Sequence, residues 1–79
     1  MMRGSCLCNA VMYELSEPPQ ELSNCHCRTC RKSHGAAYAT YARVKANTLR
    51  FTAGEEFLVS YRSSSEGERF FCPTCSSPI

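Results

Sequence analysis

The sequence lacks tryptophan and has only four glycines and four prolines, and it contains no apolar run long enough to cross a membrane. The N-terminal segment Met1–Cys6 has neither an apolar core nor a cleavage motif, so we expect no secretory signal and a cytoplasmic protein. With 79 residues the chain is too short for a two-domain enzyme. We expect a single domain over residues 1–79.

Large aliphatic and aromatic core formers are also scarce, since Leu, Ile, Val and Phe together number thirteen. Ordering a chain costs roughly 1.5 kcal/mol per residue, and a domain of this size gains little more than that from packing alone. Something besides packing must therefore hold the chain together. Seven cysteines are present. An odd number cannot pair completely in disulfides, and a reducing compartment favours metal binding.

Acidic residues are missing from the middle of the chain. Between Leu22 and Gly54 there are six basic residues and no acidic one, while the whole chain carries a net charge of +2. A basic segment of this kind can be a solvated face, or it can attract an anion such as a nucleic acid or a small acidic molecule. The modest net charge argues against nucleic acid.

The remaining pattern predicts mostly β structure, because β-branched and aromatic residues cluster between Gly, Pro or Asn. The predicted strands are Cys6–Leu15, Tyr38–Val44, Leu49–Thr52 and Phe57–Tyr61. The alanines of the second of these would also suit a helix. We expect a turn at Glu17–Gln20 and one short helical segment after Cys27, ended by Gly35.

The cysteines at the two ends of the chain have the spacing of metal ligands. Cys6 and Cys8 form a Cys-x-Cys pair, and on a strand both sulfurs would lie on one face. Cys72 and Cys75 form a Cys-x-x-Cys turn with an internal proline. Four sulfurs are the closed set of a structural zinc site, which would join the two ends of the chain.

Three cysteines remain in the middle, Cys25, Cys27 and Cys30. Three protein ligands leave a fourth position for water or substrate, so the pattern is compatible with an open zinc site. Alternatively, His26 or His34 closes the site as a second structural zinc, or the thiols serve another metal or a redox reaction. An iron–sulfur cluster is disfavoured because it takes four thiolates.

Basic residues lie among the middle cysteines, at Arg28, Arg31 and Lys32. Neighbouring cations favour thiolate over thiol, which helps both metal binding and reactivity. The pair Arg31 and Lys32 either faces solvent or binds a carboxylate of a ligand, for which Arg has the better geometry.

Taken together, these motifs resemble the family of glutathione-dependent formaldehyde-activating enzymes, which is also grouped with centromere-protein-V-like domains. The similarity covers nearly the whole chain, with all three cysteine groups in order. The motifs that carry it are Gly4 to Cys8, Cys25 to Ala36, Gly54 before the strand that ends in Tyr61, Ser63-Ser64, and Arg69 to Pro78.

The resemblance implies a small, mainly β domain of the β-tent type, held together by zinc, with two zinc ions per chain. In the family, the first and last cysteine groups hold a structural zinc, and the middle three cysteines hold the zinc of the active site. The implied activity is that of a carbon–sulfur lyase, which joins glutathione to formaldehyde and gives S-hydroxymethylglutathione. Glutathione is anionic, so Arg28, Arg31 and Lys32 are its expected contacts.

Three departures from the family pattern stand out. Asn9 and Ser76 occupy positions where the family usually has glycine, and Ser tolerates left-handed backbone less well than Asn. The family also continues for several strands beyond Ile79. The sequence is then either a naturally short member or a fragment. We expect the family's C-terminal strands to be lacking here and an exposed sheet edge that leads to dimerisation or aggregation. The alternative function is a zinc-binding module without catalysis, which contacts nucleic acid or a protein through its basic middle.

Overall fold

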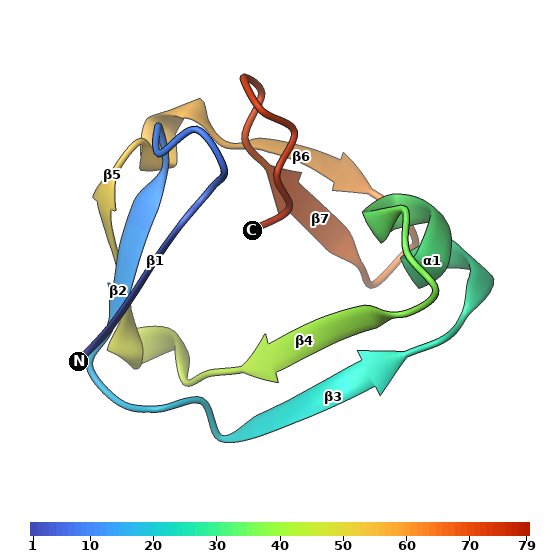
Figure 1. Ribbon diagram of the computed structural model, residues 1–79, viewed down its shortest axis with the longest axis horizontal. Coiled ribbons are helices and arrows are strands. Elements are labelled where there is room, and N and C mark those ends of the chain that lie inside the picture. The colour runs from blue at the N-terminus through green and yellow to red at the C-terminus, as the bar shows by residue number, and fades with distance from the viewer.

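Three small antiparallel sheets make up the protein, whose computed structural model describes residues 1–79. Their strand orders are β1-β2-β5, β3-β4 and β6-β7. The sheets form the three sides of a triangle, and the only α-helix lies at the corner near β7 (Figure 1). The predicted mainly β fold is confirmed.

All of the elements are short. The first sheet contains β1 (Met2–Ser5), β2 (Met12–Leu15) and β5 (Leu49–Ala53). The second contains β3 (Glu21–Cys25) and β4 (Ala39–Arg43), and the third contains β6 (Val59–Arg62) and β7 (Glu68–Phe71). The helices are α1 (Arg28–His34) and the 3-10 turns η1 (Ala46–Thr48) and η2 (Glu55–Phe57).

Several sequence predictions are confirmed by these elements. The predicted strands Tyr38–Val44 and Leu49–Thr52 correspond to β4 and β5. The helical segment after Cys27 is α1, and Gly35 ends it with a left-handed φ of 61°. The segment Glu17–Gln20 is a bent connection without regular structure.

The predicted strand Cys6–Leu15 is wrong in its first half. Only Met12–Leu15 is a strand, and Cys6 and Cys8 lie in the turn between β1 and β2. Asn9 has a φ of 66°, which no strand residue adopts, and the Cys6 N–H donates to the Val11 carbonyl across the turn (3.0 Å). The turn, not strand alternation, brings the two sulfurs together.

The predicted strand Phe57–Tyr61 begins too early. Phe57 is the last residue of η2, and β6 starts two residues later, at Val59. Gly54 has a φ of 79°, and a Cβ at this position would overlap the Ala10 carbonyl. Only glycine therefore lets the chain pass so close to the turn that carries Cys6 and Cys8.

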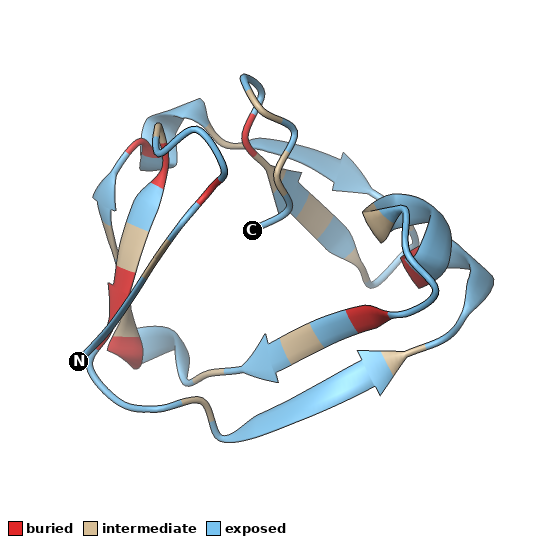
Figure 2. Ribbon diagram, in the orientation of Figure 1, coloured by how far each residue is buried: buried red, intermediate tan, exposed pale blue.

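The core is small and lies where the two ends of the chain meet. Only nine of the 79 residues are buried, and the largest fully buried side chains are Val11, Cys6 and Cys72. The partly buried residues packed against them are Ala10, Phe51, Leu58 and Cys75. The other buried residues are dispersed over β2, α1, β4, η1 and the turn at Gly54 (Figure 2). Two of the three central core side chains are thus cysteines.

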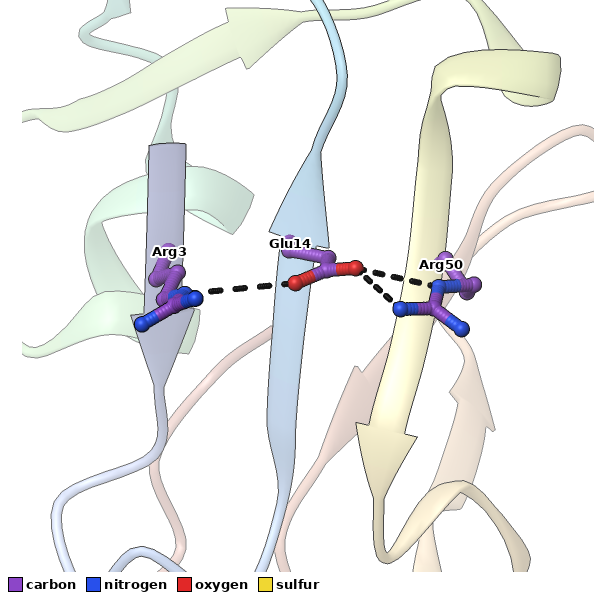
Figure 3. A network of polar contacts seen from close by, with 3 residues as sticks. All are labelled: Arg3, Glu14 and Arg50. Atoms are coloured by element: carbon purple, nitrogen blue, oxygen red, sulfur yellow. Dashed lines mark hydrogen bonds and ion pairs between the residues drawn. The ribbon is translucent and has the colours of Figure 1, made fainter. Parts of the chain in front are cut away.

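A charged ladder crosses the three strands of the first sheet. Glu14 in β2 lies between its register partners Arg3 in β1 and Arg50 in β5 (Figure 3). Two N–H groups of Arg50 donate to the Glu14 carboxylate, one of them from Nε at 3.1 Å, and Arg3 Nε lies 3.9 Å from its other oxygen. These hydrogen bonds from Arg50 lower the pKa of Glu14. The ionised carboxylate therefore favours the folded sheet.

We predict that Glu14→Gln lowers the thermal midpoint of unfolding and removes part of its acid sensitivity. Because the folded-state pKa of Glu14 is depressed, its contribution is present above the ordinary glutamate pKa and is lost as pH falls through the depressed value. Melts of wild type and variant from neutral to acidic pH measure this. The control is Glu56→Gln, an equal charge change at an exposed position. Equal shifts in both variants would contradict a specific role of Glu14.

Candidate metal centres

Four cysteine sulfurs from the two ends of the chain form one cluster. The Sγ atoms of Cys6, Cys8, Cys72 and Cys75 all lie within 4.8 Å of one another. Cys8 Sγ is 3.7 Å from Cys6 Sγ and 3.8 Å from Cys72 Sγ. A tetrahedral zinc with ordinary zinc–sulfur bonds separates its sulfurs by roughly 3.8 Å. The donor set and its spacing therefore fit a closed zinc site.

Backbone geometry holds these sulfurs in place. The Val11 N–H donates to Cys6 Sγ at 3.3 Å, and the Ser76 N–H donates to the Cys72 carbonyl at 2.7 Å. Burial opposes ionisation of Cys75, but hydrogen bonds from the backbone of Cys8 and Ser77 and from neighbouring thiols lower its pKa to about 6. Since metals bind thiolates, the backbone at this site favours the form that a metal requires.

The three middle cysteines form a second cluster at the start of α1. Cys25 is the last residue of β3, Cys27 is the N-cap of α1, and Cys30 lies in its first turn. Their Sγ atoms lie within 4.8 Å of one another. The Cys30 N–H donates to Cys27 Sγ at 3.3 Å, so the sulfur takes the place of the usual capping oxygen. Cys30 is buried, Cys25 half-buried and Cys27 exposed.

Neither histidine belongs to this cluster. The His26 ring lies 5.0 Å from the ring of Tyr38, and the His34 ring meets Tyr41 edge-on at 5.4 Å. Of the arrangements that the sequence left open, the one with three cysteines and no histidine agrees with this geometry. Three thiolates fit a zinc site that retains one position for another ligand.

Two further residues contact the second cluster and were not among the predicted site residues. The Tyr41 hydroxyl donates to Cys30 Sγ at 3.0 Å, and Arg69 Nη2 lies 3.6 Å from the same sulfur. Arg69 also donates from Nη1 to the Tyr41 oxygen (3.1 Å) and from Nε to Ser63 Oγ (3.0 Å). These hydrogen bonds, the one from Tyr41 first, lower the pKa of Cys30 to about 6. These contacts therefore favour the thiolate form of Cys30.

A cleft of about 960 Å³ opens beside Cys30. Its lining includes His34, Tyr41 and Arg69, together with apolar and aromatic side chains from all three sheets. Cys25 and Cys27 do not line it. The cleft therefore reaches the second cluster at Cys30 alone.

The predicted ligand contacts Arg28, Arg31 and Lys32 lie elsewhere. They line a shallow depression of about 490 Å³ together with residues 35–37, and no cysteine lines it. The structure therefore does not bring these three side chains into the cleft beside Cys30. Their role in binding a substrate stays a prediction.

Comparisons with known proteins agree with this arrangement. The family model of the glutathione-dependent formaldehyde-activating enzyme matches residues 1–79. A Halomonas elongata protein, named "Putative glutathione-dependent formaldehyde-activating enzyme", is 35% identical over all of this chain and 54% of its own length. A Schizosaccharomyces pombe protein, named an uncharacterized lyase, is 30% identical over 96% of this chain and 53% of its own.

A solved structure is also similar. The crystal structure of a Rhodobacter sphaeroides protein superposes with a TM-score of 0.78 and 31% identity, over 99% of this chain and 71% of that one. The chain belongs to the family of glutathione-dependent formaldehyde-activating enzymes. It spans about half the length of the curated relatives that it matches. None of its helices has the length and apolar character needed to cross a bilayer.

We predict that Ser76→Gly stabilises the protein by about 1 kcal/mol, because Ser76 has a φ of 65° and a side chain disfavours this left-handed conformation. Chemical denaturation of the metal-loaded protein measures the change. Ser77→Gly is the matched control, since the neighbouring serine has no positive φ. An equal gain in both variants, or a loss in Ser76→Gly, would show that no strain is relieved at this turn.

The two clusters should differ in what their loss does to folding. Cys72 is fully buried in the core, whereas Cys27 is exposed at a helix end. Structural zinc supplies roughly 10–16 kcal/mol of apparent binding free energy, more than small domains usually have to spare. We predict that Cys72→Ser abolishes cooperative unfolding, while Cys27→Ser still melts cooperatively. Circular dichroism and thermal melts of both variants decide this, and equal loss of structure would refute the distinction.

Proposed function

We propose that Cys25, Cys27 and Cys30 hold the zinc of an active site, and that Cys6, Cys8, Cys72 and Cys75 hold a structural zinc. The observation that carries this proposal is a cluster of three sulfurs without a fourth protein ligand, next to a cleft. A metal with a free position can take a ligand from solution, whereas a closed set of four thiolates cannot. The first cluster has the closed set.

The proposed reaction is the addition of glutathione to formaldehyde, a carbon–sulfur lyase activity that gives S-hydroxymethylglutathione. In this addition the thiol sulfur bonds to the aldehyde carbon, the carbonyl π bond breaks, and the thiol proton ends on the oxygen. Nothing is oxidised or reduced. Bound zinc supplies Lewis acidity, which favours the thiolate form of a coordinated thiol.

The residues of the chain have separate roles in this proposal. The three cysteines present an incomplete set of ligands, and Tyr41 and Arg69 hold Cys30 by hydrogen bonds. The apolar lining of the cleft shields the bound sulfur from water, which strengthens charge interactions there. We also propose a cytoplasmic location, because seven cysteines without a disulfide fit a reducing compartment.

Charge should guide the choice of thiol. Glutathione carries two carboxylates. Arg28, Arg31 and Lys32 form a cationic surface on α1, the helix that also carries Cys30. Attraction by exposed cations is long-ranged but is screened over about 10 Å at roughly 0.1 M salt. We therefore infer that the site prefers an anionic thiol over an uncharged thiol of similar size, and that salt weakens the preference.

Calorimetric titration of the zinc-loaded chain with glutathione tests this function. We expect binding at millimolar concentration or better, weaker binding at high salt, and a loss of about two- to fivefold in Arg31→Ala with unchanged zinc content. Arg43→Ala is the matched control. Arg43 is an exposed arginine of the basic middle, and it lies at the end of β4 opposite to Ala39, which pairs with Cys25. If nucleic acid binds and glutathione does not, the protein is a zinc-binding module without this activity.

A further inference from the structure

Arg69 is the one polar side chain that joins the β6–β7 hairpin to the unit formed by β3, α1 and β4. Its guanidinium donates to Tyr41 in β4 and lies within hydrogen-bond distance of Cys30 in α1. Its Nε donates to Ser63, at the end of its own hairpin. No ion pair links these two parts of the molecule. The orientation of the guanidinium is thus fixed from both sides.

This guanidinium is also the cation in direct contact with the second cluster. Arg28, Arg31 and Lys32 line a depression without any cysteine. Three thiolates around a divalent metal leave a net charge of about −1 on the cluster, and a fourth thiolate would raise it to about −2. Adding an anion to an anionic site is unfavourable in a partly buried setting unless a cation is close by. Arg69 is placed to offset that charge.

Hydrogen bonds to Cys30 have a second effect. The Tyr41 hydroxyl at 3.0 Å and Arg69 Nη2 at 3.6 Å both draw electron density from the sulfur. A ligand sulfur that donates less leaves the metal a stronger acceptor for the remaining position. Neither Cys25 nor Cys27 accepts a hydrogen bond from another side chain. The cluster is therefore asymmetric, with Cys30 as its fixed and least basic member.

We propose that Tyr41 and Arg69 are positioning residues that anchor Cys30, and that the charge of Arg69 makes the fourth position of the second cluster selective for an anionic ligand over a neutral one. This rests on the proposed function only in identifying that anion as the thiolate of a substrate. Arg69 contacts the metal ligand Cys30, and in this proposal it acts through the cluster.

The test uses the full chain loaded with one equivalent of zinc for the first cluster, followed by cobalt(II) as a coloured probe of the second. The fourth position is then titrated with 2-mercaptoethanol, which binds as a thiolate, or with imidazole, which binds neutral. Changes in the cobalt absorption bands report each affinity without any enzyme assay. Because no glutathione is used, recognition of its carboxylates does not enter.

We expect Arg69→Met to weaken binding of 2-mercaptoethanol about tenfold and to change imidazole binding less than about twofold. Arg69→Lys, which keeps the charge, should recover most of the thiol affinity. Arg62→Met is the matched control, since this arginine in β6 faces Glu68 and the Ser65 carbonyl and not the cluster. Tyr41→Phe keeps the charge, so it should lower cobalt affinity about tenfold without changing the ratio of the two ligand affinities.

Equal weakening of both ligands in Arg69→Met, or no weakening of either, would overturn the proposal. So would an Arg62→Met variant that behaves like Arg69→Met, because the effect would then follow net charge and not contact. If Arg69→Met does not fold by circular dichroism, Arg69→Gln carries the same comparison. Failure of the wild type to bind glutathione would refute the proposed function and leave the ratio of thiolate to imidazole affinity as a separate result.

Discussion

The meeting of the two chain ends at four cysteines is the constraint on which the rest of the molecule depends. The three sheets are too small to bury much surface of their own, and the largest fully buried side chains are Val11 and two of these cysteines. β1 runs directly into Cys6, and β7 runs directly into Cys72. The path of β7 in turn places Arg69 beside Cys30. β7 therefore connects the two clusters, through Cys72 at its end and Arg69 along its length.

Sequence reasoning succeeded where the determinants are local. The spacing of Cys6 with Cys8 and of Cys72 with Cys75 predicted one set of four sulfurs, and the middle cysteines predicted one set of three. Short spacings constrain sulfurs through a few backbone torsions, so few alternatives exist. The position at which α1 ends also has a local determinant, since Gly35 adopts the left-handed conformation that ends a helix.

Sequence reasoning failed where contacts between distant parts of the chain determine the local structure. β3 (Glu21–Cys25) is polar and largely exposed, so no apolar alternation marks it, and pairing with β4 alone makes it a strand. The Cys6–Leu15 segment has strand-like residues, yet the left-handed Asn9 bends it so that its cysteines can face those of the other end. Tyr41 and Arg69 are far apart in the sequence and meet only because separate sheets close the triangle. No spacing could show that contact.

The link between Cys8 and Cys72 spans 64 positions of the chain, which gives the four-sulfur cluster the character of a removable cross-link. A permanent bond closing a loop of this length would take away chain entropy worth roughly 4 kcal/mol in the unfolded state. A metal held there closes the same loop only while it is bound, so its contribution rises with the concentration of free metal. The folded population of such a protein follows the metal supply of its surroundings, and a strong chelator acts on it as a denaturant does.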